Sequence, residues 1–387
     1  MASVQRITTP KGLVRYRARW RDPEGKARER WFTKKGEADR FAASMATDVA
    51  RGQYLAPDAG RVTFADYASN WLAIQAVDPS TRQAMGIYLR VHILPALGSA
   101  RLADIRPSSV AGLVHRLSET LAPRTVRQVI ATLSAILAAA VEDGLLRTNP
   151  ATAKSVRLPR PDSRKVEPWT PAQVAAIQVA MPARYSPLVT MGAGLGLRQG
   201  EAFGLAVEDV DFLRGVVTVQ RQVKMLGSRL LFALPKGRKV RTIPMPMVVR
   251  DHLAAHLAAY PAREITLPFG DLSGEPMTAA LLMTSREGKP LNRNYINPGV
   301  WKPALVAAGI APTRDHGSHM LRHTYASVLL DRGVSIRAVS EHLGHSDPGF
   351  TLRTYTHLMP SGEDRVRAAI DDSWGSGGVD AGLASSE

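Results

Sequence analysis

The sequence of 387 residues contains no cysteine, which excludes disulfide bonds, thiolate catalysis, cysteine-ligated zinc and iron–sulfur clusters. No apolar run approaches the roughly 18 residues that span a membrane, and the N-terminus lacks the apolar segment of a signal peptide. Acidic residues are scarce relative to basic ones: 34 Asp and Glu stand against 50 Lys and Arg, a net charge of +16. We therefore expect a cytoplasmic protein, without a membrane partner, that binds a polyanion, most simply nucleic acid.

The positive charge is distributed along the chain rather than concentrated at one end. Residues 1–61 carry a net charge of +7, residues 62–160 carry +5 and residues 161–370 carry +8, whereas residues 371–387 carry −4. A disordered basic arm would place most of this charge in one block. The distribution favours several folded segments that together surround their partner, and the length fits two or three domains.

The first 57 residues have the pattern of a small three-stranded sheet followed by one helix. Apolar and basic residues alternate ahead of the turn at 22–25, which predicts a central strand with two different faces. Neighbouring strands are expected near 4–8 and 28–32, and a helix begins soon after. The basic face could simply be solvated, but its density favours contact with DNA. Its residues are Arg15, Arg17, Arg19 and Arg21.

Residues 62–155 have helical periodicity throughout and predict a compact all-helical domain. Thr63 is a predicted N-cap for the first helix. Arg124 and Arg127 begin the last helix, where the helix dipole would support contacts with DNA phosphates. The further helices are expected at about 80–93, 107–120 and 123–143.

The rest of the chain combines helical and strand patterns. Residues 154–168 are basic, contain proline and lack periodicity, which is typical of a linker. Residues 165–372 predict a mainly helical domain with some strands, and the Gly- and Ser-rich residues 373–387 predict a disordered tail. The strands are expected at about 216–223, 230–234, 240–244 and 281–285.

Six of the ten histidines fall between residues 316 and 357, and this clustering points to a site. His319 and His323 lie four residues apart on one predicted helix, a spacing that can bind a metal ion. However, no glutamate follows His319 and few carboxylates lie nearby, so a metal site is disfavoured. The alternative pairs His319 with Arg322, because residues three apart share a helix face. Imidazole and guanidinium together suit a phosphate.

Five segments of the chain, taken in order, resemble the tyrosine recombinase (phage integrase) family. The resemblance is close over about residues 165–370, and it extends more loosely to residues 62–155, which are similar to the family's helical core-binding (SAM-like) domain. Residues 1–57 resemble the arm-site-binding domain found on many integrases. The segments are GLRQGEAFGL from Gly196, PKGRKVRTIP from Pro235, HMLRHT from His319, LGH from Leu343 and TYTH from Thr354.

The resemblance implies the reaction and the residues that perform it. Tyr355 would attack a DNA phosphodiester to give a 3′-phosphotyrosine, which conserves the bond energy without ATP or a cofactor. The nearby Tyr185, Tyr295 and Tyr325 lack the expected position after the Leu-Gly-His segment. The other catalytic positions match Arg198, Lys236, His319, Arg322 and His345.

Each of these positions has an implied role. Arg198 and Arg322 would bind the non-bridging oxygens, with a hydrogen bond from His345, so that no metal is required. His319 would be the acid or base nearest the tyrosine proton, and Lys236, on a hairpin turn, would protonate the 5′-oxygen. Other basic side chains adjoin Lys236: Arg238, Lys239 and Arg241. Glu201 would orient Arg198 or His319 from the same helical face. His323 and His357 are assigned packing or supporting roles.

The family assignment leaves three functions to weigh. The first is a site-specific recombinase, the integrase of a phage or integrative element, which acts on core-type and arm-type attachment sites. The second is a DNA-binding regulator that has the fold without the chemistry, against which the complete catalytic set argues. The third is a resolvase of chromosome or plasmid dimers, which the extra N-terminal domain disfavours. Membership also implies a homotetramer at synapsis, a bacterial host with nucleoid location, and a host DNA-bending protein and excisionase as partners.

Overall fold

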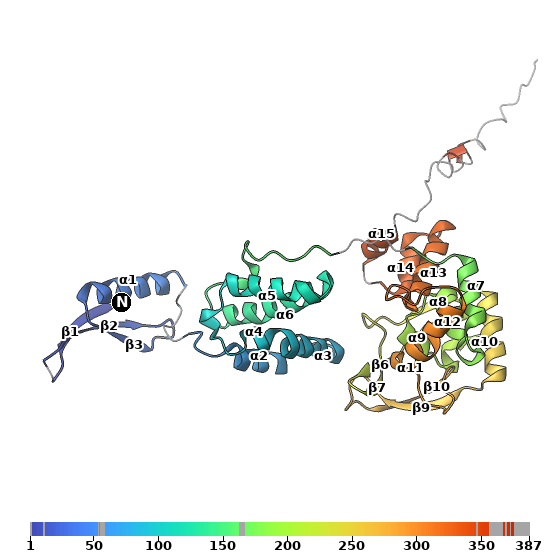
Figure 1. Ribbon diagram of the computed structural model, residues 1–387, viewed down its shortest axis with the longest axis horizontal. Coiled ribbons are helices and arrows are strands. Elements are labelled where there is room, and N and C mark those ends of the chain that lie inside the picture. The colour runs from blue at the N-terminus through green and yellow to red at the C-terminus, as the bar shows by residue number, and fades with distance from the viewer. Residues whose placement is uncertain are drawn as a thin grey trace, which may run out of the picture. The chain divides into compact units, whose positions relative to one another are not determined.

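The computed structural model describes residues 2–10, 12–52, 54, 59–161, 167–345 and 347–355, together with 367, 370, 371, 373 and 374. Contacts between residues divide the chain into two compact units, Met1–Ser163 and Arg164–Glu387 (Figure 1). His357 and nearly all of the predicted tail at 373–387 lie outside the described residues. The described part is multidomain and contains helices with small antiparallel sheets.

The N-terminal part of the first unit is a sheet with a helix on one face. Its antiparallel strands are β1 (Ser3–Thr8), β2 (Val14–Arg21) and β3 (Ala27–Phe32), in that order, followed by α1 (Lys35–Ala50). Ala18 and Trp20 on β2 are buried, and the Trp20 ring meets Phe41 of α1 edge-on at 5.3 Å. Because side chains alternate along a strand, the arginines of β2 lie on the opposite face.

The rest of the first unit is helical. Thr63 accepts a hydrogen bond from the Asp66 backbone N–H and so caps the first helix, as predicted. The core contains Phe64, Leu102, Leu133 and other side chains from each main helix. The helices are α2 (Phe64–Ala73), α3 (Pro79–Tyr88), a π-helical turn (Leu89–Ile93), α4 (Leu94–Leu97), a 3₁₀ turn (Leu102–Asp104), α5 (Pro107–Thr120), α6 (Pro123–Glu142) and a second 3₁₀ turn (Pro150–Thr152).

Helix α6 corrects one sequence expectation. Of the helices in the described residues, it is the one that is long and apolar enough to cross a membrane, although no such run was expected. Its apolar side chains Val126, Val129, Leu133 and Leu137 are buried in the core of the helical part. The length and apolarity of α6 are thus explained by packing against α3 and α5.

The second unit begins with helices and continues into short strands. Its first segments are α7 (Pro171–Ala180), a 3₁₀ turn (Ala183–Tyr185), α8 (Pro187–Leu195), α9 (Gln199–Phe203) and a 3₁₀ turn (Val207–Asp209). The strands are β4 (Val210–Asp211), β5 (Val216–Val219), β6 (Gln222–Leu226), β7 (Arg229–Ala233) and β8 (Arg241–Pro244). β4, β5 and β8 form one antiparallel sheet, whereas β6 and β7 form a separate hairpin.

The strand predicted at 216–223 is two strands in the structure. The buried Arg221 donates to Asp209 Oδ2 at 2.8 Å, so the chain turns away from the sheet between β5 and β6. A buried arginine needs a partner, and Asp209 is reached only where the ladder is interrupted. Period-two patterning in the sequence carries no sign of this pairing.

The last part of the unit is α10 (Met247–Ala259), a β9 (Arg263–Pro268) and β10 (Pro276–Leu281) hairpin, and further helices. The second strand of this hairpin ends at Leu281, where a strand at 281–285 was predicted to begin. The helices are α11 (Arg293–Ile296), a π-helical turn (Asn297–Trp301), α12 (Lys302–Ala307), α13 (His319–Asp331), α14 (Ile336–Leu343) and α15 (Pro348–Tyr355). α13, α14 and α15 lie at the end of the unit away from the β9–β10 hairpin (Figure 1).

Candidate active site

Arg198 stands immediately before α9 rather than on it. Its backbone is extended, and the Glu201 carboxylate accepts from the Arg198 backbone N–H at 2.9 Å and from its guanidinium at 2.8 Å. This arrangement corrects the expectation that both residues share a helical face. Helix capping explains the contact between Glu201 and Arg198, because a side chain at the third helical position can reach back to the unpaired N–H at the helix start.

Glu201 is 0% exposed and binds a second arginine as well. Arg241 on β8 donates to both oxygens of Glu201, at 3.1 and 2.7 Å, and its Nε donates to the His342 carbonyl at 2.6 Å. Burial alone would raise the pKa of Glu201, but the hydrogen bonds and charges of Arg241 and Arg198 lower it to about 2. A charged carboxylate therefore holds two guanidinium groups in place.

Arg322 lies on α13 and is only 1% exposed. Its guanidinium donates to the Gly196 carbonyl at 2.8 Å and to the Leu343 carbonyl. Gly196 ends α8 with φ +65°, and a Cβ there would lie 2.5 Å from the Tyr325 ring, so only glycine fits. Gly196 thus brings its own backbone carbonyl to Arg322.

His345 follows Gly344, which ends α14 in the left-handed region with φ +62°. The Nε2 atom of His345 lies 3.0 Å from Arg322 Nη2, and its Nδ1 lies 2.8 Å from Thr351 Oγ1. Because arginine can only donate, Nε2 accepts and Nδ1 carries the proton that is donated to Thr351. Burial, together with the charges of Arg322 and Arg198, lowers the pKa of His345 to about 4.

Tyr355 ends α15 and is 1% exposed. Its hydroxyl lies 2.7 Å from Nδ1 of His323, one turn along α13 from His319. Burial raises the pKa of Tyr355 to about 12 and lowers that of His323 to about 4, with Arg322 contributing to the shift of His323. The histidine in contact with the tyrosine is thus His323, not His319 as expected.

His319 begins α13 and is an exposed residue. Its ring meets His323 edge-on, with centroids 4.9 Å apart. The positions of the two histidines along α13 explain why His323 rather than His319 contacts Tyr355, because α15 packs beyond the first turn of α13. His319 is instead open to a ligand that approaches the start of the helix.

Lys236 is exposed on the loop between β7 and β8. These two strands belong to different sheets, which corrects the expectation of a hairpin turn. The loop is nonetheless tight: Arg238 N–H donates to the Pro235 carbonyl at 2.8 Å, and both Gly237 and Arg238 have positive φ. The loop leads directly into Arg241, so the lysine is attached to the same strand as the buried arginine.

The competing tyrosines have other partners. Tyr185 and Tyr295 share a hydrogen bond of 2.9 Å between their hydroxyls, and the Tyr325 hydroxyl lies 3.3 Å from His342.

Among the described residues, no group of three or more His, Asp or Glu side chains could hold a metal ion.

Three residues of this site were missed or undervalued in the sequence: Arg241, His323 and Thr351. Arg241 stood in a run of basic residues with no sign of which one is buried, and Thr351 had no charge to mark it. Only His323, as part of a histidine cluster, carried a signal. Arg241 and His323 are recognised through contacts with residues 40 and 32 positions away, and Thr351 through its contact with His345, six residues before it.

The chain matches two family models: the phage integrase family over residues 172–361 and the phage integrase central domain over residues 64–155. It is 28% identical to a tyrosine recombinase XerC-like protein of Caldanaerobacter subterraneus subsp. tengcongensis, over 91% of this chain and 94% of the relative. The fold is similar to that of the Tn1549 transposon integrase in complex with a circular intermediate DNA, with a TM-score of 0.67 and 22% identity over 80% of this chain and 99% of the other.

A lambda integrase tetramer bound to a Holliday junction is similar at a TM-score of 0.56 and 16% identity, over 89% of this chain and 96% of the other. Together with the ordered motifs and the gathered arginines, histidines and tyrosine, the matches lead to one conclusion. The chain belongs to the phage integrase family of tyrosine recombinases and is a site-specific DNA recombinase.

Proposed function

We propose that this recombinase cleaves and rejoins DNA through a 3′-phosphotyrosine at Tyr355, as the integrase of a phage or integrative element. The observation that carries the proposal is the neighbourhood of Tyr355. Its hydroxyl lies in a region where Arg322 contacts His345, and Arg198 is held beside them through Glu201. A phosphodiester bound there would meet guanidinium groups on its non-bridging oxygens and a tyrosine hydroxyl as nucleophile.

The charges of the site favour an anion. Arg198, Arg241 and Arg322 contribute three positive charges, and the buried Glu201 contributes one negative charge. The excess of positive charge is available to the phosphate and to the further charge that develops as phosphorus is attacked. Because the guanidinium groups are already fixed, little reorganisation is needed when DNA binds.

Lys236 is proposed to protonate the 5′-oxygen as it leaves. Its exposed position on a short turn leaves the ammonium group accessible to a DNA backbone. Neither ATP nor a metal ion enters the step, since the phosphotyrosine conserves the bond energy and the arginines supply the positive charge.

A nicked suicide substrate that carries the cognate site tests the proposal. Wild type should form a covalent protein–DNA adduct that survives denaturation, and Tyr355→Phe should form none. Tyr295→Phe is the matched control, because that hydroxyl also bonds a buried partner but lies elsewhere. An adduct with Tyr355→Phe would overturn the nucleophile assignment, and no adduct with wild type on any candidate site would favour the regulator.

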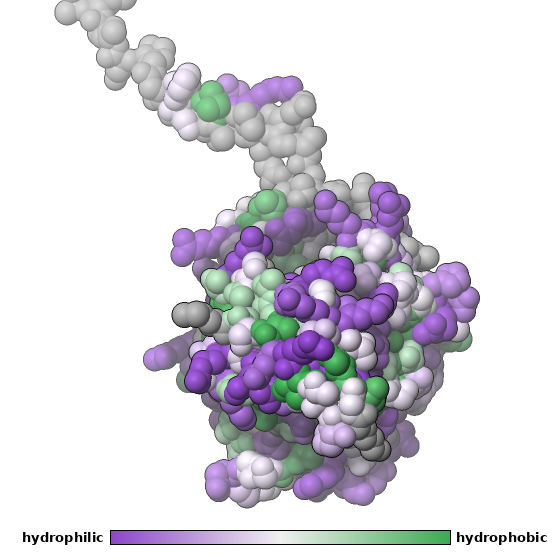
Figure 2. Space-filling view, turned by 90° about the vertical axis from the view of Figure 1, so that its left-hand side faces the viewer, coloured by the Kyte–Doolittle hydropathy of each residue, from purple (hydrophilic) through white to green (hydrophobic). Residues whose placement is uncertain are grey.

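We further propose that residues 1–57 bind arm-type sites through the arginine face of β2. In the space-filling view of Figure 2, hydrophilic side chains on the face toward the viewer are interspersed with smaller hydrophobic areas. Arg19 and Arg21 are exposed on this face, while Arg17 is held by Gln5 at 2.7 Å and lies over the Trp31 ring. A sheet with such a face can enter a major groove. Arg19→Ala should weaken binding of arm-type DNA but not of core-type DNA.

The helical part at 62–155 is proposed to bind core-type sites. Arg124 and Arg127 line a cavity of about 690 Å³ beside the start of α6, together with Gln128 and Ser134. Arg127 also donates to the Pro159 carbonyl at 3.3 Å, so the guanidinium lies near the surface. Arg124→Ala should reduce affinity for all core-type sequences alike and lower the salt dependence of binding, as expected of a phosphate contact.

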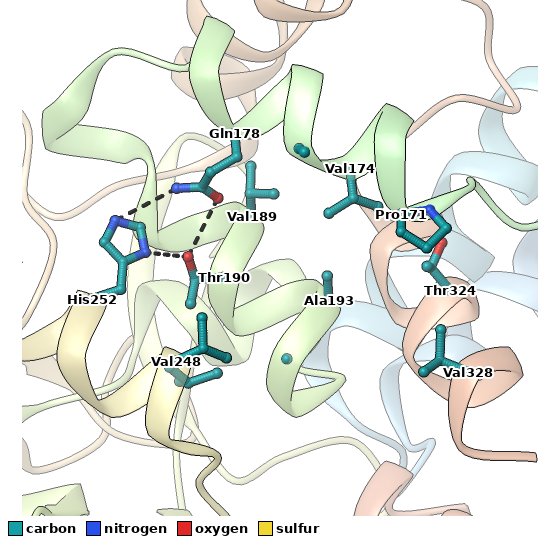
Figure 3. Close-up of a pocket in the computed structure, with 13 residues that line it drawn as sticks. Pro171, Val174, Gln178, Val189, Thr190, Ala193, Val248, His252, Thr324 and Val328 are labelled. Carbon is teal, nitrogen blue, oxygen red and sulfur yellow. Dashed lines mark hydrogen bonds between the residues drawn. The ribbon is translucent and has the colours of Figure 1, made fainter. Parts of the chain in front are cut away.

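A homotetramer is proposed for the synaptic complex. An apolar cavity of about 580 Å³ lies among α7, α8, α10 and α13, lined by valines such as Val174, Val189 and Val248 (Figure 3). The C-terminal segment of a neighbouring copy is the proposed occupant, since Ile370 and Trp374 are exposed apolar residues near the end of the chain. Truncation after Pro360 and Val248→Asp should both abolish synapsis while leaving binding to a single site intact.

A further inference from the structure

The contact between His323 and Tyr355 is direct, and it joins a half-buried histidine to a buried tyrosine. The tyrosine hydroxyl and His323 Nδ1 are 2.7 Å apart, the two rings are 5.6 Å apart, and the hydroxyl belongs to a residue that is almost fully buried. The other titratable or charged groups that face His323 are His319 and Arg322 on the same helix, and His345 from the turn after α14.

Both partners of this hydrogen bond are uncharged at neutral pH. The imidazole is neutral, because burial and Arg322 hold the pKa of His323 at about 4. The tyrosine is protonated, because burial raises its pKa to about 12. The tautomer of His323 then sets the direction, and in the tautomer that carries its proton on Nε2 the hydroxyl donates to Nδ1. In that tautomer the proton that must leave Tyr355 points at a nitrogen lone pair.

We propose that His323 is the general base for Tyr355, an inference that rests on Tyr355 being the nucleophile. As the bond from Tyr355 Oη to phosphorus forms, the bond from phosphorus to the 5′-oxygen breaks. The hydroxyl proton passes to His323 Nδ1, and a proton from Lys236 passes to the departing 5′-oxygen. In religation the 5′-hydroxyl attacks phosphorus and its proton returns to the neutral Lys236 amine, while the phosphotyrosine bond breaks and His323 returns its proton to the phenolate oxygen.

The electrostatics of the site with a bound phosphodiester support the proton transfer from Tyr355 to His323. An imidazolium beside Arg322 is unfavourable in the unliganded site, which is why the histidine is neutral there. A bound phosphodiester adds one negative charge, and the pentavalent transition state adds another, so the imidazolium gains a counter-charge as it forms. His319 is one ring further from the hydroxyl, and its exposed position suits contact with the phosphate instead.

The experiment measures single-turnover cleavage of the nicked suicide substrate by the full chain. His323→Gln and His323→Asn are compared with wild type, and His342→Gln is the matched control, because His342 also bonds a tyrosine hydroxyl on α13. We expect both His323 variants to cleave about 100-fold more slowly, the range of a lost general base, with DNA affinity unchanged. The control should cleave at nearly the wild-type rate.

A second measurement separates chemistry from structure. Tyr355 is replaced by a fluorinated tyrosine whose phenol ionises near neutral pH and so needs no base. In the His323→Gln background this replacement should restore most of the lost cleavage rate. The cleavage rate that remains in His323→Gln should rise with pH. A variant that has lost only packing would gain nothing from a more acidic phenol.

Three outcomes overturn the inference. Wild-type cleavage by both His323 variants excludes a base at this position, and a slow rate that the fluorinated tyrosine does not restore assigns His323 to structure alone. Rescue of a His319→Gln variant, with none for His323→Gln, assigns the base to His319. An adduct formed by Tyr355→Phe would overturn the nucleophile itself, which is a different result from any of these.

Discussion

The arginines of the active site and its lysine are held in opposite ways. Arg322 is buried and donates to two backbone carbonyls, and Arg198 and Arg241 share the buried carboxylate of Glu201. Lys236 stands exposed on a turn. The half of the site that would bind phosphate is thus complete before DNA arrives. The half that would donate a proton to the leaving group is not held by such contacts.

The difference follows from the demands on each group. Groups that stabilise charge in the transition state act best when they are fixed in advance, because the free energy needed to reorganise them would offset the stabilisation they provide. A proton donor must meet a leaving oxygen whose position is set by the DNA, so a side chain on a surface turn suffices. Mutations should therefore have unlike effects in the two halves: loss of activity and fold in one, and loss of activity alone in the other.

Arg322→Lys should have the largest effect. The ammonium group retains the charge but cannot donate to the Gly196 and Leu343 carbonyls and a phosphate together. We expect cleavage of the suicide substrate to fall about 1,000-fold, or about 4 kcal/mol of transition-state stabilisation. Quench-flow measurement of adduct formation checks this. A loss below tenfold would mean that a positive charge at this position is all the phosphate requires.

Glu201→Gln should be next, and its effect should fall on stability. The amide keeps the size of the side chain but leaves Arg198 and Arg241 without a counter-charge in a buried place. Breaking a buried ion pair in this way costs about 3–5 kcal/mol. Urea unfolding of the variant should show a clear drop in midpoint. The Arg198 guanidinium should also lose its position, so that activity falls with stability.

The exposed ion pair Arg337 with Glu341, 3.1 Å apart on α14, is the control for this prediction. Glu341→Gln should change the free energy of unfolding by less than about 1 kcal/mol. Equal effects of the two substitutions would contradict the idea that the Glu201 network is the structural centre of the site.

The Glu201 network also marks the limit of what the sequence predicts. Arg198 and Arg322 were identifiable because each lies in a contiguous motif, and helix periodicity placed α5 and α6 near their observed bounds. The pairing of Arg241 with Glu201 joins segments 40 residues apart. Periodicity reports which face of an element is buried but not which polar side chain on that face finds which partner.

The same reasoning explains the errors at Lys236 and His323. The two strands around Lys236 resemble a hairpin in sequence, because adjacent strands with a turn between them usually pair. Here Asp209 binds Arg221 and separates β5 from β6, so β8 pairs with β5 instead. For the histidines, His319 and His323 lie on neighbouring turns of one helix, and only the position of α15 decides which meets Tyr355.

Lys236→Ala tests the exposed half of the site. It should slow cleavage about 100-fold, because the leaving oxygen loses its proton donor, but the free energy of unfolding should not change. A substrate with sulfur in place of the bridging 5′-oxygen should restore the rate, since a thiolate leaves without protonation. Lys239→Ala, on the same loop, is the control and should act nearly as wild type. Rescue of Lys239→Ala instead would move the role to that residue.

The smallest effect is expected from pH, and of the two halves of the site the buried one supplies it. His323 and His345 have pKa values of about 4 in the folded protein and about 6.5 when unfolded. Between these values the unfolded chain binds more protons, so stability falls as pH decreases from about 6.5 to 4 and is constant above that range. Each histidine should lower the free energy of unfolding by about 1–2 kcal/mol at pH 5, after allowance for partial exposure.

Thermal unfolding at pH 7 and pH 5 measures this loss of stability. His323→Gln should reduce the loss, whereas Lys236→Ala should leave it unchanged. An identical pH dependence in all three proteins would show that the acid sensitivity originates outside the active site, and that the two halves do not differ in this respect.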